Sequence, residues 1–186
     1  MIAFDLDDVI LNLTDVLSPH LKSLTGIDTR TRTEFYAPVP DGMSNNTFRK
    51  IFNELSLKYT IKAKPVKGSI DALENIYKLT NEPIHIITAR KADHEKIVNK
   101  WMKINVKDRF PYHIDFSGSV PKYKFFKPDT KYFVDDALHN VEKLYKYLDI
   151  FFIFDRPWNR NSITHKNVIR IKYLKSVYIF LKNTVK

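Results

Sequence analysis

Short runs of apolar residues recur along the chain and predict the strands of a sheet. They are rich in β-branched and aromatic residues, as strands usually are. The runs are IAF (2–4), IHIIT (84–88), YHIDF (112–116), YFV (132–134) and IFFIF (150–154). IHIIT and IFFIF are apolar almost throughout, which favours strands that are buried on both faces.

Between these runs, apolar residues return every three or four positions, the spacing of a helix with one buried face. The stretches 69–80, 91–104 and 139–148 show this pattern, and so does KYLKSVYIFLK near the end of the chain. Strands that alternate with helices predict an α/β fold, in which a doubly wound parallel sheet carries helices on both faces.

About sixty residues after the first strand break the alternation. They read as a helix over about 12–25, a loop that contains Pro and Gly (TEFYAPVPDGMSNN), and a second helix over about 46–59. A structureless connection of that length is rare in a compact domain. We therefore expect a small helical cap at 14–67, inserted into a core built from residues 1–13 and 68–186.

Composition narrows the class of protein. A chain of 186 residues suits one domain with a small insertion. The absence of cysteine excludes disulfides, thiolate metal sites and a cysteine nucleophile, and it fits a cytoplasmic location. No apolar run approaches the length of a membrane span, and the first residues lack a signal-peptide pattern, so we expect no membrane association.

The formal net charge of +10 is compatible with a nucleic-acid partner. However, the lysines are spread along the chain, and a small phosphorylated substrate would benefit from the same positive field. We therefore favour the small substrate, keep nucleic acid as the less favoured partner, and leave a homodimer open.

Chemically reactive side chains follow the predicted strands. In a parallel α/β sheet, ligands bind at the carboxyl ends of the strands. The residues found there are Asp5, Asp7 and Asp8; Thr88, Ala89 and Arg90; Lys122 or Lys124; and Asp135 with Asp136. The order of these groups along the chain is an acid, a hydroxyl, a lysine and an acid pair. Together they indicate phosphoryl transfer far more specifically than any one of them does alone.

Each residue type has a role in that chemistry. Asp5 can attack phosphorus as a nucleophile, and Asp7 can protonate the leaving oxygen and then activate water. Asp135 and Asp136 complete an oxygen site for Mg²⁺. Thr88 and the amides behind it, with Ala89 and Arg90, can bind phosphate oxygens, and a lysine offsets the charge of the transition state.

The order DLDDVI, IITAR, lysine and FVDDALHN resembles the haloacid dehalogenase superfamily of Mg²⁺-dependent phosphotransferases. WM at 101–102 and FDRPWNR at 154–160 resemble its 5'(3')-deoxyribonucleotidase group. The resemblance covers residues 1–9 and about 68–175. It implies an Asp5 nucleophile, an Asp7 acid/base, and Mg²⁺ held by the Asp5 carboxylate, the Asp7 carbonyl and one acid of Asp135-Asp136. It also implies that the cap reads the substrate, a deoxyribonucleoside monophosphate.

Four points stay open. The spacing to Asp135 admits both lysines, and we favour Lys124 slightly over Lys122. Asp8 stands where glycine is common in the superfamily and has no derived role. In the cap, Phe35 could stack on a base and Arg49 could meet a phosphate. A 3'-phosphatase acting on nucleic-acid ends and a catalytically silent binding protein with this fold are the alternative functions.

Overall fold

The computed structural model describes residues 1–26, 28–33, 39–40, 42–160 and 165–184. Its centre is a parallel sheet of six strands in the order β3-β2-β1-β4-β5-β6. The strands are β1 (Ile2–Phe4), β2 (Ile84–Thr88), β3 (Tyr112–Phe116), β4 (Tyr132–Asp135), β5 (Ile150–Phe154) and β6 (Val168–Ile171). The α/β prediction is confirmed, and all five predicted strands are present; β6 was not predicted.

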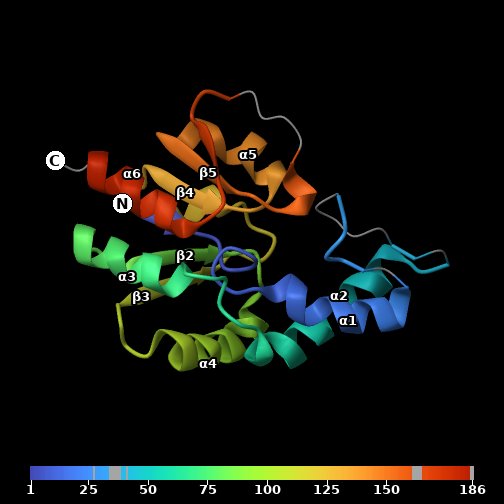
Figure 1. Ribbon diagram of the computed structural model, residues 1–186. Helices are drawn as coiled ribbons and strands as arrows, with labels where there is room; N and C mark the ends of the chain where they lie inside the picture. Colours follow the sequence, from blue (N-terminus) through green and yellow to red (C-terminus); the bar gives the residue numbers. More distant parts are fainter. Residues whose placement is uncertain (27, 34–38, 41, 161–164, 185–186) are drawn as a thin grey trace.

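The described residues form six α-helices beside the sheet (Figure 1). They are α1 (Leu13–Thr25), α2 (Asn45–Tyr59), α3 (Ser69–Thr80), α4 (Glu95–Val106), α5 (Leu138–Leu144) and α6 (Leu174–Thr184). The stretch expected as one helix over 91–104 divides into a 3₁₀ turn at Ala92–His94 and α4. The stretch 139–148 likewise becomes α5 followed by a 3₁₀ turn at Tyr145–Tyr147.

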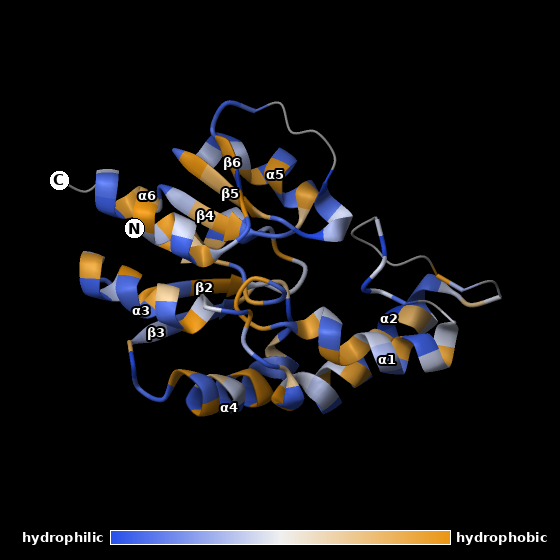
Figure 2. Cartoon of the chain, in the orientation of Figure 1, coloured by the Kyte–Doolittle hydropathy of each residue, from blue (hydrophilic) through white to orange (hydrophobic). Residues whose placement is uncertain are grey.

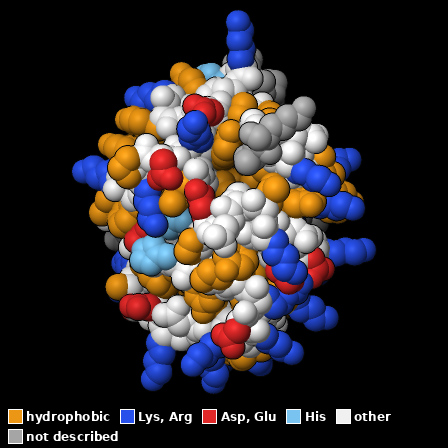
Figure 3. Space-filling model, turned by 90° about the vertical axis from the view of Figure 1, so that its left-hand side faces the viewer, with side chains coloured by type: hydrophobic (Ala, Val, Ile, Leu, Met, Phe, Trp, Pro, Cys, Tyr) orange, Lys and Arg blue, Asp and Glu red, His pale blue; other side chains and the backbone are white. Residues whose placement is uncertain are grey.

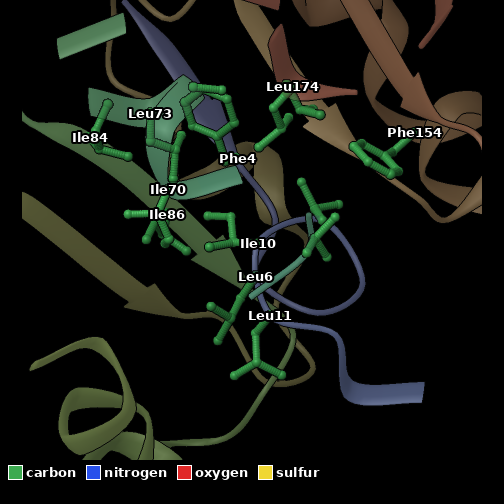
Figure 4. Packing of buried hydrophobic residues seen from close by; sticks show 14 of the residues in the cluster. Phe4, Leu6, Ile10, Leu11, Ile70, Leu73, Ile84, Ile86, Phe154 and Leu174 are labelled. Carbon is green, nitrogen blue, oxygen red and sulfur yellow. The ribbon is translucent and has the colours of Figure 1, made fainter. Parts of the chain in front are cut away.

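Two hydrophobic clusters cover opposite faces of the sheet. The larger one joins strand residues such as Phe4 and Ile86 to buried positions of α3, α4 and α6, and Figure 4 shows part of it. The smaller one contains Ala3, Ile87 and Phe133 with Val141 and Leu144 of α5. Figure 2 shows the apolar strands between helices whose apolar and polar residues alternate. The sheet is therefore doubly wound, as the sequence predicts.

The inserted segment contributes α1 and α2, close to the bounds expected from the sequence. Both helices lie beyond the ends of the strands toward which the arrows point (Figure 1). The buried side chains Leu13, Leu17 and Leu21 join α1 to the larger cluster of the core. The insertion therefore lies at the sheet edge where ligands bind in α/β folds. No helix in the described part of the chain has the length and apolar character needed to cross a bilayer.

Candidate active site

The ends of β1 and β4 bring the predicted acids together. The two strands are neighbours, and the backbone N–H of Asp5 donates to the carbonyl of Val134 at 2.7 Å. Asp5 follows β1, whereas Asp135 and Asp136 lie at the end of β4. All three are buried, and one carboxylate oxygen from each lies within 4.8 Å of the others. We call Asp5, Asp135 and Asp136 the acid cluster.

Lys122 is the lysine that reaches the acid cluster. Its Nζ lies 2.9 Å from Asp5 Oδ1 and 2.7 Å from Asp135 Oδ2, and its side chain is 6% exposed. Lys124 is exposed, so the geometry does not support the preference for it. Both residues belong to the 3₁₀ turn at Lys122–Phe125. With three residues per turn, side chains two positions apart point in different directions, so one of the two faces solvent.

The electrostatics of the acid cluster are unfavourable without a further cation. Burial raises the pKa of Asp5 to about 7, with help from Asp135 and Asp7 and against the attraction of Lys122. Burial and the neighbouring acids raise the pKa of Asp136 well above its ordinary value. Burial alone would lower the pKa of Lys122, but Asp135 and Asp5 outweigh it and raise that pKa. Three carboxylates and one ammonium leave a formal charge of −2 when ionised.

This charge predicts an unusual dependence of stability on pH for the metal-free protein. Asp5 binds its proton more tightly folded than unfolded, so its contribution to stability falls as pH rises from about 4 to about 7. Replacing Asp5 by Asn removes the contribution. In EDTA, the melting temperature of Asp5→Asn minus that of the wild type should increase across this range. A difference that stays flat with pH would contradict the raised pKa.

The acid cluster fits a divalent cation. Mg²⁺ prefers oxygen ligands and takes one or two carboxylates with phosphate and water. Oδ2 of Asp135 accepts from Lys122 and Asn140, and Oδ1 accepts from the Ala137 backbone. Oδ2 of Asp136 accepts from Trp158, and no donor reaches its other oxygen among the described residues. Of the two adjacent acids, Asp136 thus has the freer oxygen for a metal.

The segment that contains Trp158 holds Asp136 in place. Trp158 Nε1 donates to Asp136 Oδ2 at 2.8 Å, and the side-chain amide of Asn159 donates to the Asp136 carbonyl at 2.7 Å. Both residues are buried. The sequence marked FDRPWNR as a distinctive stretch but gave it no role. In the structure this stretch positions Asp136, and Asn140 positions Asp135 in the same way by donating to its Oδ2.

Asp8 orients the turn that follows β1. Its φ is +57°, a left-handed conformation in which glycine is comfortable and Asp is tolerated. Its carboxylate accepts from the backbone N–H and the hydroxyl of Thr14, at 3.0 and 2.6 Å, in the first turn of α1. Its carbonyl accepts from the guanidinium of Arg156. Asp8 therefore links the end of β1 to the insertion and to the segment after β5.

Asp7 and Arg90 form an ion pair with two hydrogen bonds, close to Asp5 of the acid cluster. Arg90 Nε lies 2.9 Å from Asp7 Oδ2, and its NH2 lies 2.7 Å from Oδ1. A third donor of Arg90 reaches the hydroxyl of Thr60 at the end of α2. Arg90 thus connects β2, the turn after β1 and the insertion, and its side chain faces Asp7 rather than open solvent.

The other predicted residues lie as follows. The Thr88 hydroxyl is buried and accepts from the backbone N–H of Arg90 at 3.2 Å, whereas Ala89 is exposed. Arg49 is exposed on α2, and no contact among the described residues joins it to the acid cluster. Phe35 lies outside the described residues.

The sequence did not single out Arg32, which the insertion brings to the site. Its guanidinium carbon lies 4.1 Å from the ring centre of Trp158. Burial lowers the pKa of Arg32, and the charges of Asp8 and Asp136 oppose that effect. No catalytic motif marks this position, so only the fold reveals that a cationic cap residue lies beside the acids.

Solved structures share this fold. A haloacid dehalogenase-like family hydrolase from Streptococcus pneumoniae superposes with a TM-score of 0.66 at 15% identity, over 96% of this chain and 97% of that one. One from Xanthomonas campestris gives 0.57 at 11% identity, over 98% and 94%. CbbY from Rhodobacter sphaeroides, in complex with phosphate, gives 0.57 at 10%, over 95% of each chain. No family model and no curated protein matches the sequence.

Proposed function

We propose that this chain is a Mg²⁺-dependent phosphomonoesterase that works through a phosphoryl group on Asp5. The observation that carries the proposal is the acid cluster with Lys122 at the carboxyl edge of a haloacid dehalogenase-type fold. Such a site combines a buried carboxylate nucleophile with fixed positive charge. The phosphate complex of a structural neighbour supports a phosphorylated ligand.

The side chains of this chain divide the reaction into two steps. Asp5 attacks the phosphorus atom, the bond from phosphorus to the leaving oxygen breaks, and a proton from Asp7 neutralises that oxygen. Asp7 then takes a proton from water, which attacks the phosphorus and releases inorganic phosphate from Asp5. Lys122 holds Asp5 through its ion pair and offsets the charge of the transferred group.

The ion pair of Asp7 with Arg90 must open for this chemistry. A phosphate dianion is a stronger partner for a guanidinium than one carboxylate is, because it offers more charge and three acceptor oxygens. Substrate that binds Arg90 would therefore release Asp7 for proton transfer. This exchange also gives Arg90 the substrate-binding role that the sequence suggested.

Asp5 and Asp136, with the carbonyl of Asp7, would hold Mg²⁺. When bound, the ion neutralises the excess charge of the acid cluster and polarises a phosphate oxygen. Because burial raises the pKa of both Asp5 and Asp136, metal affinity at this site should increase with pH.

We propose a nucleoside monophosphate, and a deoxyribonucleotide in particular, as the substrate. The resemblance of FDRPWNR to the 5'(3')-deoxyribonucleotidases supports this choice. Arg32, from the segment between α1 and α2, lies against Trp158 and within the field of Asp136, which supports a contact between Arg32 and a substrate at the acid cluster.

A phosphate-release screen with and without Mg²⁺ tests this function. The panel contains deoxyribonucleoside and ribonucleoside monophosphates, sugar phosphates and 3'-phosphorylated oligonucleotides. We expect the highest kcat/KM with a deoxyribonucleoside monophosphate and turnover that requires Mg²⁺. No turnover of any phosphate ester, including p-nitrophenyl phosphate, would instead favour a silent binding protein with this fold.

The net charge of +10 supports the rival 3'-phosphatase, which a salt series separates. Binding to an oligonucleotide releases counterions, so its affinity should fall steeply with salt, whereas a mononucleotide should respond weakly. A preference for the oligonucleotide that disappears at high salt would overturn the mononucleotide assignment.

A further inference from the structure

A second group of metal-ligating side chains lies away from the acid cluster, on β2 and the edge strand β3. It consists of His85, His113 and Asp115, and one ligand atom from each lies within 4.8 Å of the others. His85 and His113 are register partners, and Asp115 is opposite Ile87. Register partners and alternate residues share a face of a sheet, so all three side chains share the face that carries Ala3 and Phe133. We call them the histidine–aspartate cluster.

The Asp115 carboxylate lies between the two imidazole rings. Its Oδ2 is 2.6 Å from His85 Nε2, and its Oδ1 is 3.2 Å from His113 Nε2. The ring centres of the two histidines are 5.6 Å apart. Both Nε2 atoms thus lie within hydrogen-bonding distance of one carboxylate, so two nitrogen ligands and one oxygen ligand are close enough to meet at a small cation.

We propose that the histidine–aspartate cluster binds a divalent transition metal, Zn²⁺ above all, through two imidazoles and one carboxylate. Zn²⁺ accepts nitrogen and oxygen ligands at about 2.0–2.2 Å in tetrahedral sites, and three protein ligands leave the fourth position to water. Tetrahedral ligands at that distance are roughly 3.4 Å apart. The two histidine–aspartate separations, 2.6 and 3.2 Å, need to open by less than about 1 Å, and the exposed ring of His113 has room to move.

The surroundings of His85 favour a ligand role over simple packing. Its side chain is 1% exposed on a strand that is otherwise apolar apart from Thr88. Burial lowers the pKa of His85, although the neighbouring Asp115 opposes the effect. The Nδ1 atom of His85 has no hydrogen-bond partner among the described residues. The polar contact of the ring is the one between its Nε2 atom and Asp115.

The charges that face the cluster come from both strands and from one neighbouring segment. His113 and Lys127 both disfavour positive charge on His85, and Asp115 favours it. Lys127 is exposed, so solvent and salt weaken its repulsion of a cation. Histidine side chains reach the surface beside acidic and basic ones on the face in Figure 3.

Ligand chemistry separates this site from the acid cluster. His85 precedes Thr88 by three residues, which is about 10 Å along a strand. Imidazole selects Zn²⁺, Co²⁺ and Ni²⁺, whereas a site made only of carboxylates and carbonyls suits Mg²⁺. A metal on the histidine–aspartate cluster would tie the edge strand β3 to β2, independently of any phosphatase activity.

A cobalt titration of the 186-residue chain in excess Mg²⁺ tests this proposal. The excess Mg²⁺ is added to fill the site proposed at the acid cluster, and Co²⁺ in a tetrahedral nitrogen and oxygen site absorbs strongly in the visible range. We expect the absorption to saturate at one equivalent, to disappear when Zn²⁺ is added, and to accompany a higher melting temperature. Absorption that never develops, or Co²⁺ that Mg²⁺ displaces completely, would overturn the proposal.

Two matched variants assign the ligands. His113→Ala changes an exposed side chain, so the fold should persist, and Co²⁺ affinity should fall about tenfold or more. His165→Ala is the control, because His165 also faces a carboxylate, that of Glu142 at 3.1 Å, but lies outside the cluster. Equal loss of affinity in both variants, or none in His113→Ala with circular dichroism unchanged, would contradict the assignment.

Discussion

Asp5→Asn is expected to lose phosphatase turnover by roughly a thousandfold or more, since it removes the nucleophile itself. An amide cannot form the phosphoryl intermediate, and none of the other carboxylates takes its position at the end of β1. The change should be tested as kcat with the best substrate of the screen, at saturating Mg²⁺.

The fold should survive this change. Asn has nearly the shape of Asp and keeps an oxygen for Lys122, while one of the buried like charges disappears. The melting temperature of Asp5→Asn at neutral pH without metal should therefore equal or exceed that of the wild type. Asp71→Asn is the matched control, because Asp71 is exposed on α3 and pairs with Arg109. Its activity should remain at the wild-type level.

Lys122→Met is expected to destabilise the metal-free protein by about 3–5 kcal/mol and to abolish turnover. Removing one partner of a buried ion pair leaves uncompensated charge, and here Asp5 and Asp135 both lose their cation. Methionine keeps the length and apolar stem of the side chain, so the loss reports on charge rather than on packing. Urea unfolding gives the free energy, and Mg²⁺ should restore part of it by supplying the missing positive charge.

Lys124→Met provides the control two residues away in the same 3₁₀ turn. Lys124 is exposed, so the substitution should change the free energy of unfolding by at most about 0.5 kcal/mol and leave kcat unchanged. If Lys124→Met were the inactive variant, or if Lys122→Met remained as stable as the wild type without metal, the assignment of the lysine would be wrong.

The spacing of apolar residues was sufficient to predict most of the fold, because most strands and helices have a regular pattern of apolar and polar positions. IHIIT and IFFIF are buried across almost their whole length, and SIDALENIYKLT forms α3 over the predicted bounds. β6 was not predicted because its sequence, VIRI, is short, is mostly not fully buried and contains the exposed Arg170. It becomes a strand by pairing with β5, an interaction that local pattern does not contain.

The candidate active site, too, was predictable from the sequence only in part. The carboxyl-end rule located Asp5 and the Asp135-Asp136 pair, which the structure brings together. The choice between Lys122 and Lys124 depended on the phase of one 3₁₀ turn, which sequence spacing does not determine. The roles of Asp8 and Trp158 depend on contacts with residues 6 and 22 positions away along the chain. Such contacts follow from the packing of whole elements.

The central claim is that Asp5 carries the phosphoryl group during turnover. The most direct measurement is acid quenching of the enzyme a few milliseconds after mixing with substrate and Mg²⁺, followed by mass spectrometry of the N-terminal peptide. We predict phosphoryl mass on the peptide at Asp5 in the wild type and none in Asp5→Asn. Turnover with no phosphorylated peptide, or phosphorylation that persists in Asp5→Asn, would contradict the account.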